Sequence, residues 1–165
     1  LIDLTGINDR AIQIEAVDLD TLLHEACDAV RMIATERDIA ISFDTSHGER
    51  SVAHGDAWAI RRIVDNVVAN ALEFSPPGAS IDVSAETAGG SAEIVVRDTG
   101  IGMSRDVLRQ LSRPLAEQDD EMGGTMTGTG SGLALSRRLA DAMGATLRFD
   151  SAPGAGTTVT LRLPA

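Results

Sequence analysis

The residues best suited to chemistry in this sequence begin with two asparagines, Asn66 and Asn70, four positions apart. On a helix this spacing puts both carboxamides on one face, one turn apart. A second motif follows an apolar run farther along the chain, where the carboxylate Asp98 precedes glycines at Gly100 and Gly102. Because Asp and Gly are typical of turns, the second motif taken alone also fits an ordinary hairpin.

A third motif is a glycine cluster, Gly128, Gly130 and Gly132, directly before the apolar run Leu133–Leu135. This run has the character of a helix start. The first backbone N–H groups of a helix have no partner within it and its dipole is positive there, so phosphate can bind at that end. The alternative for the cluster alone is a flexible linker with a helix cap. Taken in order, the three motifs predict a pocket for a purine, a metal ion and a row of phosphates, which indicates nucleotide binding.

Length and composition set the class of protein. The chain has 165 residues, of which 43% are hydrophobic, enough for one domain with its own core. Its formal charge is 14 − 25 = −11 and every cation is Arg, which argues against general nucleic-acid binding because that needs a basic surface. Cys27 is the single cysteine, so no internal disulfide can form, and this fits a reducing compartment. The sequence shows no signal peptide or membrane-length apolar run, and it begins without Met, so we expect a piece of a longer protein.

Hydrophobic periodicity predicts alternating helices and strands. The predicted helices cover residues 19–35, 56–74, 104–111 and 131–143. The predicted strands cover residues 39–43, 80–87, 91–98, 147–151 and 157–163, with a mobile loop over residues 113–129. Asp18 or Asp20 caps the first helix, and the apolar stripes of the two long helices, including Ile33 and Trp58, are predicted to be buried. Several helices on one side of a mostly antiparallel sheet define a two-layer α/β sandwich. A Rossmann fold is disfavoured because a polar loop, rather than a strand, precedes Gly128.

The motifs resemble those of the GHKL superfamily, which includes sensor histidine kinases, gyrase, the Hsp90 chaperone and MutL. The similar segments are Asn66–Ala71 for the N box, Asp98–Met103 for the G1 box, Gly128–Leu135 for the G2 box and Gly154–Val159 for the closing glycine-threonine element. Their spacing is most similar to that of the catalytic and ATP-binding domain of a bacterial two-component histidine kinase. The resemblance implies the end of a dimerisation helix and a linker over residues 1–16, followed by an ATP-binding domain over residues 17–165. It implies a Bergerat-type fold, in which helices cover one face of a mixed, mostly antiparallel sheet.

The same resemblance implies roles for the residues that would hold the base. Asp98 would accept a hydrogen bond from the exocyclic amine of adenine, which favours adenine over guanine. Thr157 would support that contact through a bridging water. Gly100 and Gly102 would let the backbone pass close to the base.

A magnesium and phosphate region is implied as well. Asn70 would ligate Mg²⁺ through its carboxamide oxygen, and Asn66 would line the same region, so these two are the candidate catalytic residues. The phosphates would meet the glycine loop, which would also act as a lid hinge. The candidates there are Gly128, Gly130, Ser131, Gly132 and Leu133.

Some positions depart from the family pattern. Glu73 stands where these kinases usually have Lys or Arg, and Ser131 replaces the usual Leu between two glycines. The stretch 111–115 lacks the two Phe residues of the F box. A gapless comparison puts Glu117 where some relatives carry Arg, whereas a shift of one residue aligns Gln118 with a Gln seen in others. The residues expected to bind the purine and the metal are therefore all present, whereas several residues that usually bind the terminal phosphates are replaced.

The resemblance implies an ATP-binding, Mg²⁺-dependent kinase domain of a sensor histidine kinase, which passes the γ-phosphate to a His on a separate dimerisation domain. The implied partners are ATP, that domain, a response regulator and a second copy in a homodimeric parent, with no nucleic acid and no membrane contact by this domain. A cytoplasmic location is expected, in a parent that can be membrane-anchored. Two alternatives stay open: a non-catalytic nucleotide-binding pseudokinase module, and a stand-alone kinase of the anti-sigma-factor type. The linker-like residues 1–10 favour the histidine kinase over the stand-alone form.

Overall fold

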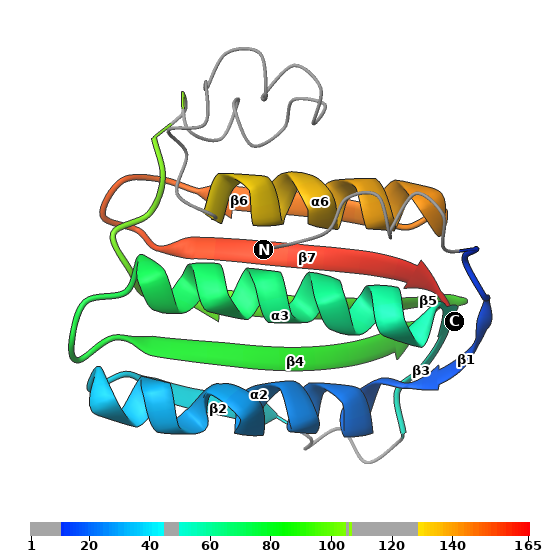
Figure 1. The fold of residues 1–165 in the computed structure, drawn as a ribbon, viewed down its shortest axis with the longest axis horizontal. Coiled ribbons are helices and arrows are strands. Elements are labelled where there is room, and N and C mark those ends of the chain that lie inside the picture. The colour runs from blue at the N-terminus through cyan, green and yellow to red at the C-terminus, as the bar shows by residue number, and fades with distance from the viewer. Residues whose placement is uncertain (1–10, 45–49, 105, 107–128) are drawn as a thin grey trace.

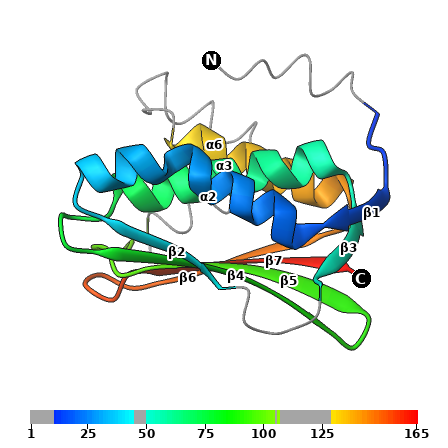
Figure 2. The same ribbon diagram turned by 90° about the horizontal axis from the view of Figure 1, so that it is seen from below.

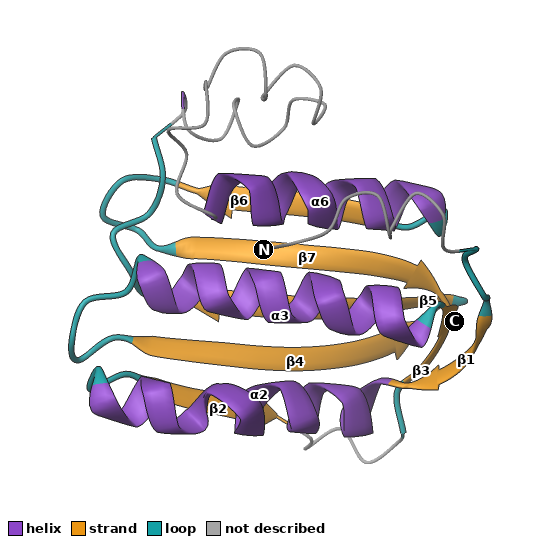
Figure 3. Cartoon of the chain, in the orientation of Figure 1, coloured by secondary structure: helices purple, strands orange, loops and turns teal. Residues whose placement is uncertain are grey.

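A computed structural model describes residues 11–44, 50–104, 106 and 129–165 of the chain. This part of the chain forms two layers, with helices on one face of a sheet (Figure 2). The helices are α2 (Leu19–Glu36), α3 (Ala57–Glu73) and α6 (Thr129–Ala142). They run side by side, with α3 between the other two (Figure 3). The predicted two-layer α/β sandwich is confirmed.

The main sheet has five strands in the order β2-β4-β5-β7-β6. The strands are β2 (Ala40–Asp44), β4 (Ser80–Ala88), β5 (Ser91–Asp98), β6 (Thr146–Ser151) and β7 (Thr157–Pro164). Only the β2–β4 pair of this sheet is parallel, and the remaining neighbours are antiparallel. In β4 the buried residues Ile81 and Val83 alternate with the exposed Asp82 and Glu86. One face of the sheet therefore packs against the helices while the other meets solvent.

A small second sheet joins β1 (Glu15–Asp18) to β3 (Val52–Gly55) in antiparallel register. The sequence did not predict these strands, because four residues are too few to show a clear period of two. A single residue separates the end of β3 from the start of α3. Because β1 pairs with β3, the segment before α2 is held next to the start of α3. Strand β1 begins two residues before the predicted domain boundary at residue 17, which stays a prediction.

Helix α3 is the central support of the fold. Its Asp56 cap accepts a hydrogen bond from the backbone N–H of Ala59 at 3.0 Å, and Pro76 and Pro77 follow its last residue closely. One face is buried against the sheet and its neighbouring helices. The buried side chains are Ala59, Ile60, Ile63, Val64, Val67, Val68, Asn70, Ala71 and Leu72.

Two residues predicted for the core are instead exposed. Trp58 is 39% exposed and Ile33 is 47% exposed. Trp58, Arg62 and Asn66 follow one another at four-residue spacing, so Trp58 belongs to the polar stripe of α3 rather than its buried face. The guanidinium of Arg62 lies 5.9 Å from the centre of the Trp58 ring and covers part of it. Ile33 lies toward the carboxyl end of α2, where the helix presents it to solvent.

The predicted elements within the described residues match the observed ones to within two residues at each end. The hairpin at Gly89 and Gly90 is confirmed, as is the glycine stop at Gly144, which has φ +71°. Asp18, rather than Asp20, caps α2. The predicted helix over residues 104–111 and the predicted loop over residues 113–129 lie almost wholly outside the described residues.

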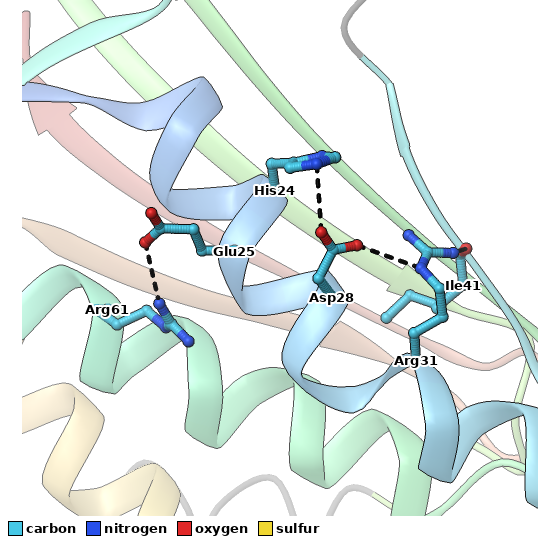
Figure 4. Close-up of polar contacts among 6 residues, drawn as sticks. All are labelled: His24, Glu25, Asp28, Arg31, Ile41 and Arg61. Carbon is cyan, nitrogen blue, oxygen red and sulfur yellow. Dashed lines mark hydrogen bonds and ion pairs between the residues drawn. The ribbon is translucent and has the colours of Figure 1, made fainter.

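Charged side chains on α2 and α3 pair with one another at the surface (Figure 4). The guanidinium of Arg61 lies 2.9 Å from the Asp65 carboxylate and 3.5 Å from that of Glu25 across the helix interface. Farther along α2, Asp28 lies between His24 and Arg31. Exposed pairs of this kind contribute little to stability, but the contact with Glu25 joins α3 to α2.

Candidate functional site

The predicted site residues gather at one end of the molecule, where α3 ends, α6 begins and β6 turns into β7 (Figure 1). Asp98 is the last residue of β5 and stands directly opposite Thr157, the first residue of β7. Antiparallel pairing of two central strands thus brings together two residues that lie far apart in sequence.

The Asp98 carboxylate is held by the backbone around it. Its Oδ1 atom accepts hydrogen bonds from the N–H of Gly100 at 2.9 Å and of Thr157 at 3.3 Å. Both bonds involve Oδ1, so Oδ2 is left to accept a further donor. Asp98 is only 6% exposed. Burial raises the pKa of its carboxyl above the ordinary value, and the two backbone donors offset part of that rise.

Gly100 and Gly102 are required by close backbone packing. A Cβ on Gly100 would lie 2.5 Å from the carbonyl oxygen of Phe74 and 2.9 Å from Oδ1 of Asp98. Gly102 has φ +73°, and a Cβ there would overlap the carbonyl of Ala152. The loop after β5 therefore passes against both the end of α3 and the β6–β7 turn.

A serine that the sequence interpretation missed organises this turn. Ser151 Oγ accepts the N–H of Met103 at 2.7 Å, donates to the carbonyl of Gly156 at 2.9 Å and lies 2.8 Å from Oγ1 of Thr157. The signal for it was the predicted final hairpin, whose first strand ends at Ser151 where its second strand begins at Thr157. Thr157 is 5% exposed, and its hydroxyl is fixed in place by this contact.

Asn70 has a buried oxygen with no hydrogen-bond partner in the described part of the chain. Asn70 is 5% exposed as a whole, and its Oδ1 atom is buried. Leaving a buried carbonyl oxygen unpaired costs about 1–3 kcal/mol, so this atom indicates a ligand. A carboxamide oxygen is a hard donor that suits Mg²⁺. No group of three or more His, Cys, Asp or Glu side chains among the described residues is placed to hold a metal ion. Mg²⁺ commonly takes few protein ligands beside water and phosphate oxygens.

Asn66, one turn earlier, contacts α6. Its amide nitrogen donates to the carbonyl oxygen of Gly132 at 3.1 Å and to Oγ of Ser136 at 3.2 Å. Ser136, which the sequence interpretation also missed, is fully buried. The two predicted asparagines thus differ: the nitrogen of Asn66 is engaged, while the oxygen of Asn70 is unpaired.

The remaining predicted residues differ in how they are placed relative to the site. Gly130 and Ser131 lie in the first turn of α6, and Gly128 lies outside the described residues. The side chain of Leu133 is 1% exposed within the core, so any contact with phosphate would use its backbone. Glu73 is the exposed last residue of α3.

The end of α3 connects Asp98 to the asparagine pair, Asn66 and Asn70. Phe74, its C-cap, donates to the carbonyl of Asn70 at 3.1 Å, and its own carbonyl accepts the N–H of Ile101 at 3.2 Å. The loop carrying Gly100 is thereby fixed one turn from Asn70. The buried Asp98 carboxylate and the Asn70 oxygen, which has no partner among the described residues, thus lie at the same end of α3, and Asn66 joins this helix to the first turn of α6.

Comparison with known proteins agrees with this geometry. Residues 55–165 match the family described as histidine kinase-, DNA gyrase B-, and HSP90-like ATPase. The chain belongs to this family.

Similar proteins are sensor kinases. The chain is 32% identical over 166 residues to the sensor-like histidine kinase SenX3 of Mycolicibacterium smegmatis, covering 99% of this chain and 43% of that protein. It is 38% identical over 177 residues to the histidine protein kinase DivJ of Caulobacter vibrioides, covering 99% of this chain and 29% of that protein. The crystal structure of full-length ShkA in complex with AMPPNP is 25% identical with a TM-score of 0.77, over 94% of this chain and 32% of that chain. The chain thus spans less than half the length of these relatives.

No helix among the described residues has both the length and the apolar character needed to cross a bilayer.

Proposed function

We propose that this chain is the ATP-binding catalytic domain of a sensor histidine kinase, which uses Mg²⁺ and transfers the γ-phosphate of ATP to a His on a separate dimerisation domain. The observation that carries the proposal is the junction at Phe74, which joins the buried Asp98 carboxylate to the helix bearing the unpaired oxygen of Asn70.

The chemistry of each group supports an adenine nucleotide. The free Oδ2 of Asp98 suits an amine donor, and adenine offers an exocyclic amine where guanine offers a carbonyl. Because the Ser151 hydroxyl donates to the carbonyl of Gly156, the Thr157 hydroxyl can donate to Ser151. The oxygen of Thr157 then keeps a lone pair that can accept a hydrogen bond from a water bridging to the base. The match to ShkA, whose structure is described as a complex with AMPPNP, is consistent with this site.

Asn70 would hold the metal through Oδ1, and Asn66 would stand beside the phosphates with the first turn of α6. A bound Mg²⁺ supplies positive charge to neutralise the phosphate oxygens during transfer. The protein residues contribute position: α3 sets the two carboxamides one turn apart, and α6 presents unpaired backbone N–H groups.

Both arginines of α3 are engaged by other side chains, and the guanidinium of Arg37 reaches the end of this helix, where it donates to the carbonyl of Leu72 at 3.4 Å. Of the two α3 arginines, Arg61 pairs with acidic residues on its α2 side and Arg62 covers Trp58, while Glu73 is a carboxylate. This arrangement favours, as a second candidate, a module that binds nucleotide without transferring phosphate. We place kinase activity first because the base and metal features are complete. The dimerisation domain, a response regulator, a homodimeric parent and a cytoplasmic location, where ATP is available, belong to the proposed kinase.

Radiolabelled ATP with the longer parent protein that includes the acceptor helix tests the proposal. The wild-type protein should acquire label that is lost in acid and kept in base, as expected for phosphohistidine. The Asn70→Ala protein should lose the label. Binding of ATP without labelling of the wild type would instead support the non-catalytic module.

A further inference from the structure

Three polar groups form a closed hydrogen-bond ring between α3 and α6. The amide nitrogen of Asn66 donates to the carbonyl oxygen of Gly132 at 3.1 Å and to Oγ of Ser136 at 3.2 Å. The hydroxyl of Ser136 in turn donates to the same Gly132 carbonyl at 2.9 Å. Ser136 is fully buried, so its hydroxyl is unavailable to bulk water.

The donors and acceptors in this ring can be counted. A carboxamide has two N–H donors on nitrogen and none on oxygen, and a serine hydroxyl has one hydrogen and two lone pairs. The single hydrogen of Ser136 goes to Gly132, so its oxygen must accept from Asn66. The nitrogen of the Asn66 carboxamide therefore faces α6. Turning the carboxamide over would place Oδ1 against two oxygens, and both hydrogen bonds from Asn66 would be lost.

The ring therefore fixes which side of the Asn66 carboxamide carries the oxygen. Oδ1 of Asn66 lies beside the Gly132 backbone, 3.7 Å from where a Cβ on that glycine would stand. Asn66 shares a helix face with Asn70, whose own oxygen is buried without a partner among the described residues. Removing the hydroxyl would leave the Gly132 carbonyl as the remaining partner of the Asn66 nitrogen in the ring, and the preferred orientation would weaken.

We propose that Ser136 is a positioning residue for the magnesium–phosphate site, acting through Asn66: its hydroxyl holds the carboxamide of Asn66 in one orientation, with the nitrogen on α6 and the oxygen beside the first turn of that helix, and ties this turn to α3. This inference rests on the proposed function, because it assigns a new residue to the same site.

The test is calorimetric titration of the chain with ATP over a range of magnesium concentrations, comparing the wild type with Ser136→Ala. Alanine suits a helix interior and removes one oxygen only. The loss of one hydrogen bond should raise the magnesium concentration for half-maximal ATP binding by about threefold to tenfold. Binding of adenosine, which has no phosphate, should be unchanged. Ser136→Thr, which keeps the hydroxyl, should restore the magnesium requirement of the wild type.

A matched control is Thr35→Ala. Thr35 also bonds its hydroxyl to a carbonyl one turn earlier, that of Arg31 at 2.9 Å, but on the exposed surface of α2. It should leave the magnesium requirement unchanged. An unchanged requirement in Ser136→Ala would overturn the inference, as would an equal loss of ATP and adenosine binding, which would indicate a general packing role.

Nuclear magnetic resonance of the Asn66 side-chain amide gives a readout that needs no ligand. Its hydrogens should exchange slowly in the wild type and faster in Ser136→Ala. If the wild type binds no ATP with magnesium, the proposed function fails and this inference fails with it. If the wild type binds but Ser136→Ala matches it in both measurements, only the role of Ser136 is overturned.

Discussion

Asp98 shows how one buried side chain is adapted to a ligand. Removing a carboxylate from water favours its protonated form, and the two backbone N–H groups on Oδ1 restore only part of the lost solvation. The net result is a raised pKa for the Asp98 carboxyl. An amine donor on a ligand would supply a hydrogen bond to Oδ2. Without that ligand, burial of the charged carboxylate lowers the stability of the folded protein.

The raised pKa of Asp98 gives a pH-dependent stability. A carboxyl whose pKa is higher in the folded than in the unfolded state binds its proton more tightly when folded, so its contribution to stability is greatest at low pH and falls as pH rises through the interval between the two pKa values. Relative to Asp98→Asn, which cannot titrate, the ligand-free wild type should gain free energy of unfolding as the pH is lowered from neutral. Urea unfolding of both proteins across that range is the measurement. A constant difference between them would show that burial does not shift this carboxyl.

Glu73 is predicted to weaken binding of the terminal phosphate. It is the exposed last residue of α3, three positions after Asn70. Solvent reduces its repulsion of a γ-phosphate, so Glu73→Lys should tighten ATP binding by about twofold to fivefold and ADP binding less. Glu36→Lys is a matched control, because Glu36 is the exposed last residue of α2. Equal shifts for ATP and ADP would contradict a contact with the terminal phosphate, and a raised magnesium requirement would indicate that Glu73 helps to hold the metal.

At the scale of elements, α3 connects the amino-terminal segment to the site. Asp56, 1% exposed, accepts the N–H of Gln13 at 2.8 Å and that of Ala59 at 3.0 Å, and its own N–H points to the sulfur of Met143 at 3.4 Å. The carboxylate of Asp56 thus fixes the start of α3 to the chain before β1, and its backbone N–H contacts the residue that follows α6. The asparagines follow on the same rigid element.

Loss of this cap should be costly. Asp56→Ala removes the acceptor of two backbone N–H groups, and it should lower the free energy of unfolding by about 2 kcal/mol. Asp18→Ala removes the cap of α2, which is more open to solvent, and should lower it by about 1 kcal/mol or less. Denaturant unfolding measures both. A smaller effect at Asp56 than at Asp18 would show that burial of the cap adds nothing.

The elements themselves could be predicted because their local signals agree with their tertiary setting. The alternation in residues 80–87 and 91–98 and the intervening glycines were enough to define β4, β5 and their hairpin. Trp58 was misassigned because its hydrophobicity was weighed without the helical phase that places it with Arg62. Ser136 could not be recognised from the sequence, because its role depends on Asn66, which the packing of α3 against α6 brings close. Ser151 could be placed at the end of the predicted hairpin, but its contact with Met103 depends on the loop after β5, which the sequence did not position.

At the scale of the whole molecule, Cys27 reports on the integrity of the core. Its thiol is fully buried in α2, and burial raises its pKa, so alkylation must wait for the structure to open. A ligand that binds only the folded state lowers the population of the open state by a factor of one plus the ratio of ligand concentration to dissociation constant. ATP with Mg²⁺ at 100 times the dissociation constant should therefore slow alkylation about a hundredfold. Kinetics with iodoacetamide, with and without nucleotide, measure this. Rapid reaction of the native protein, at the rate seen in urea, would contradict the burial of Cys27.

In the proposed function, this end of the fold binds an adenine nucleotide through Asp98. Isothermal calorimetry with Mg²⁺ tests it most directly, using ATP and GTP on the wild type and on Asp98→Asn, with urea unfolding to verify that the variant is folded. ATP should bind the wild type more tightly than GTP, and Asp98→Asn should weaken ATP binding by about tenfold to a hundredfold through loss of a charge-assisted hydrogen bond. Equal affinity of the wild type for ATP and GTP, or unchanged ATP affinity in folded Asp98→Asn, would contradict the account.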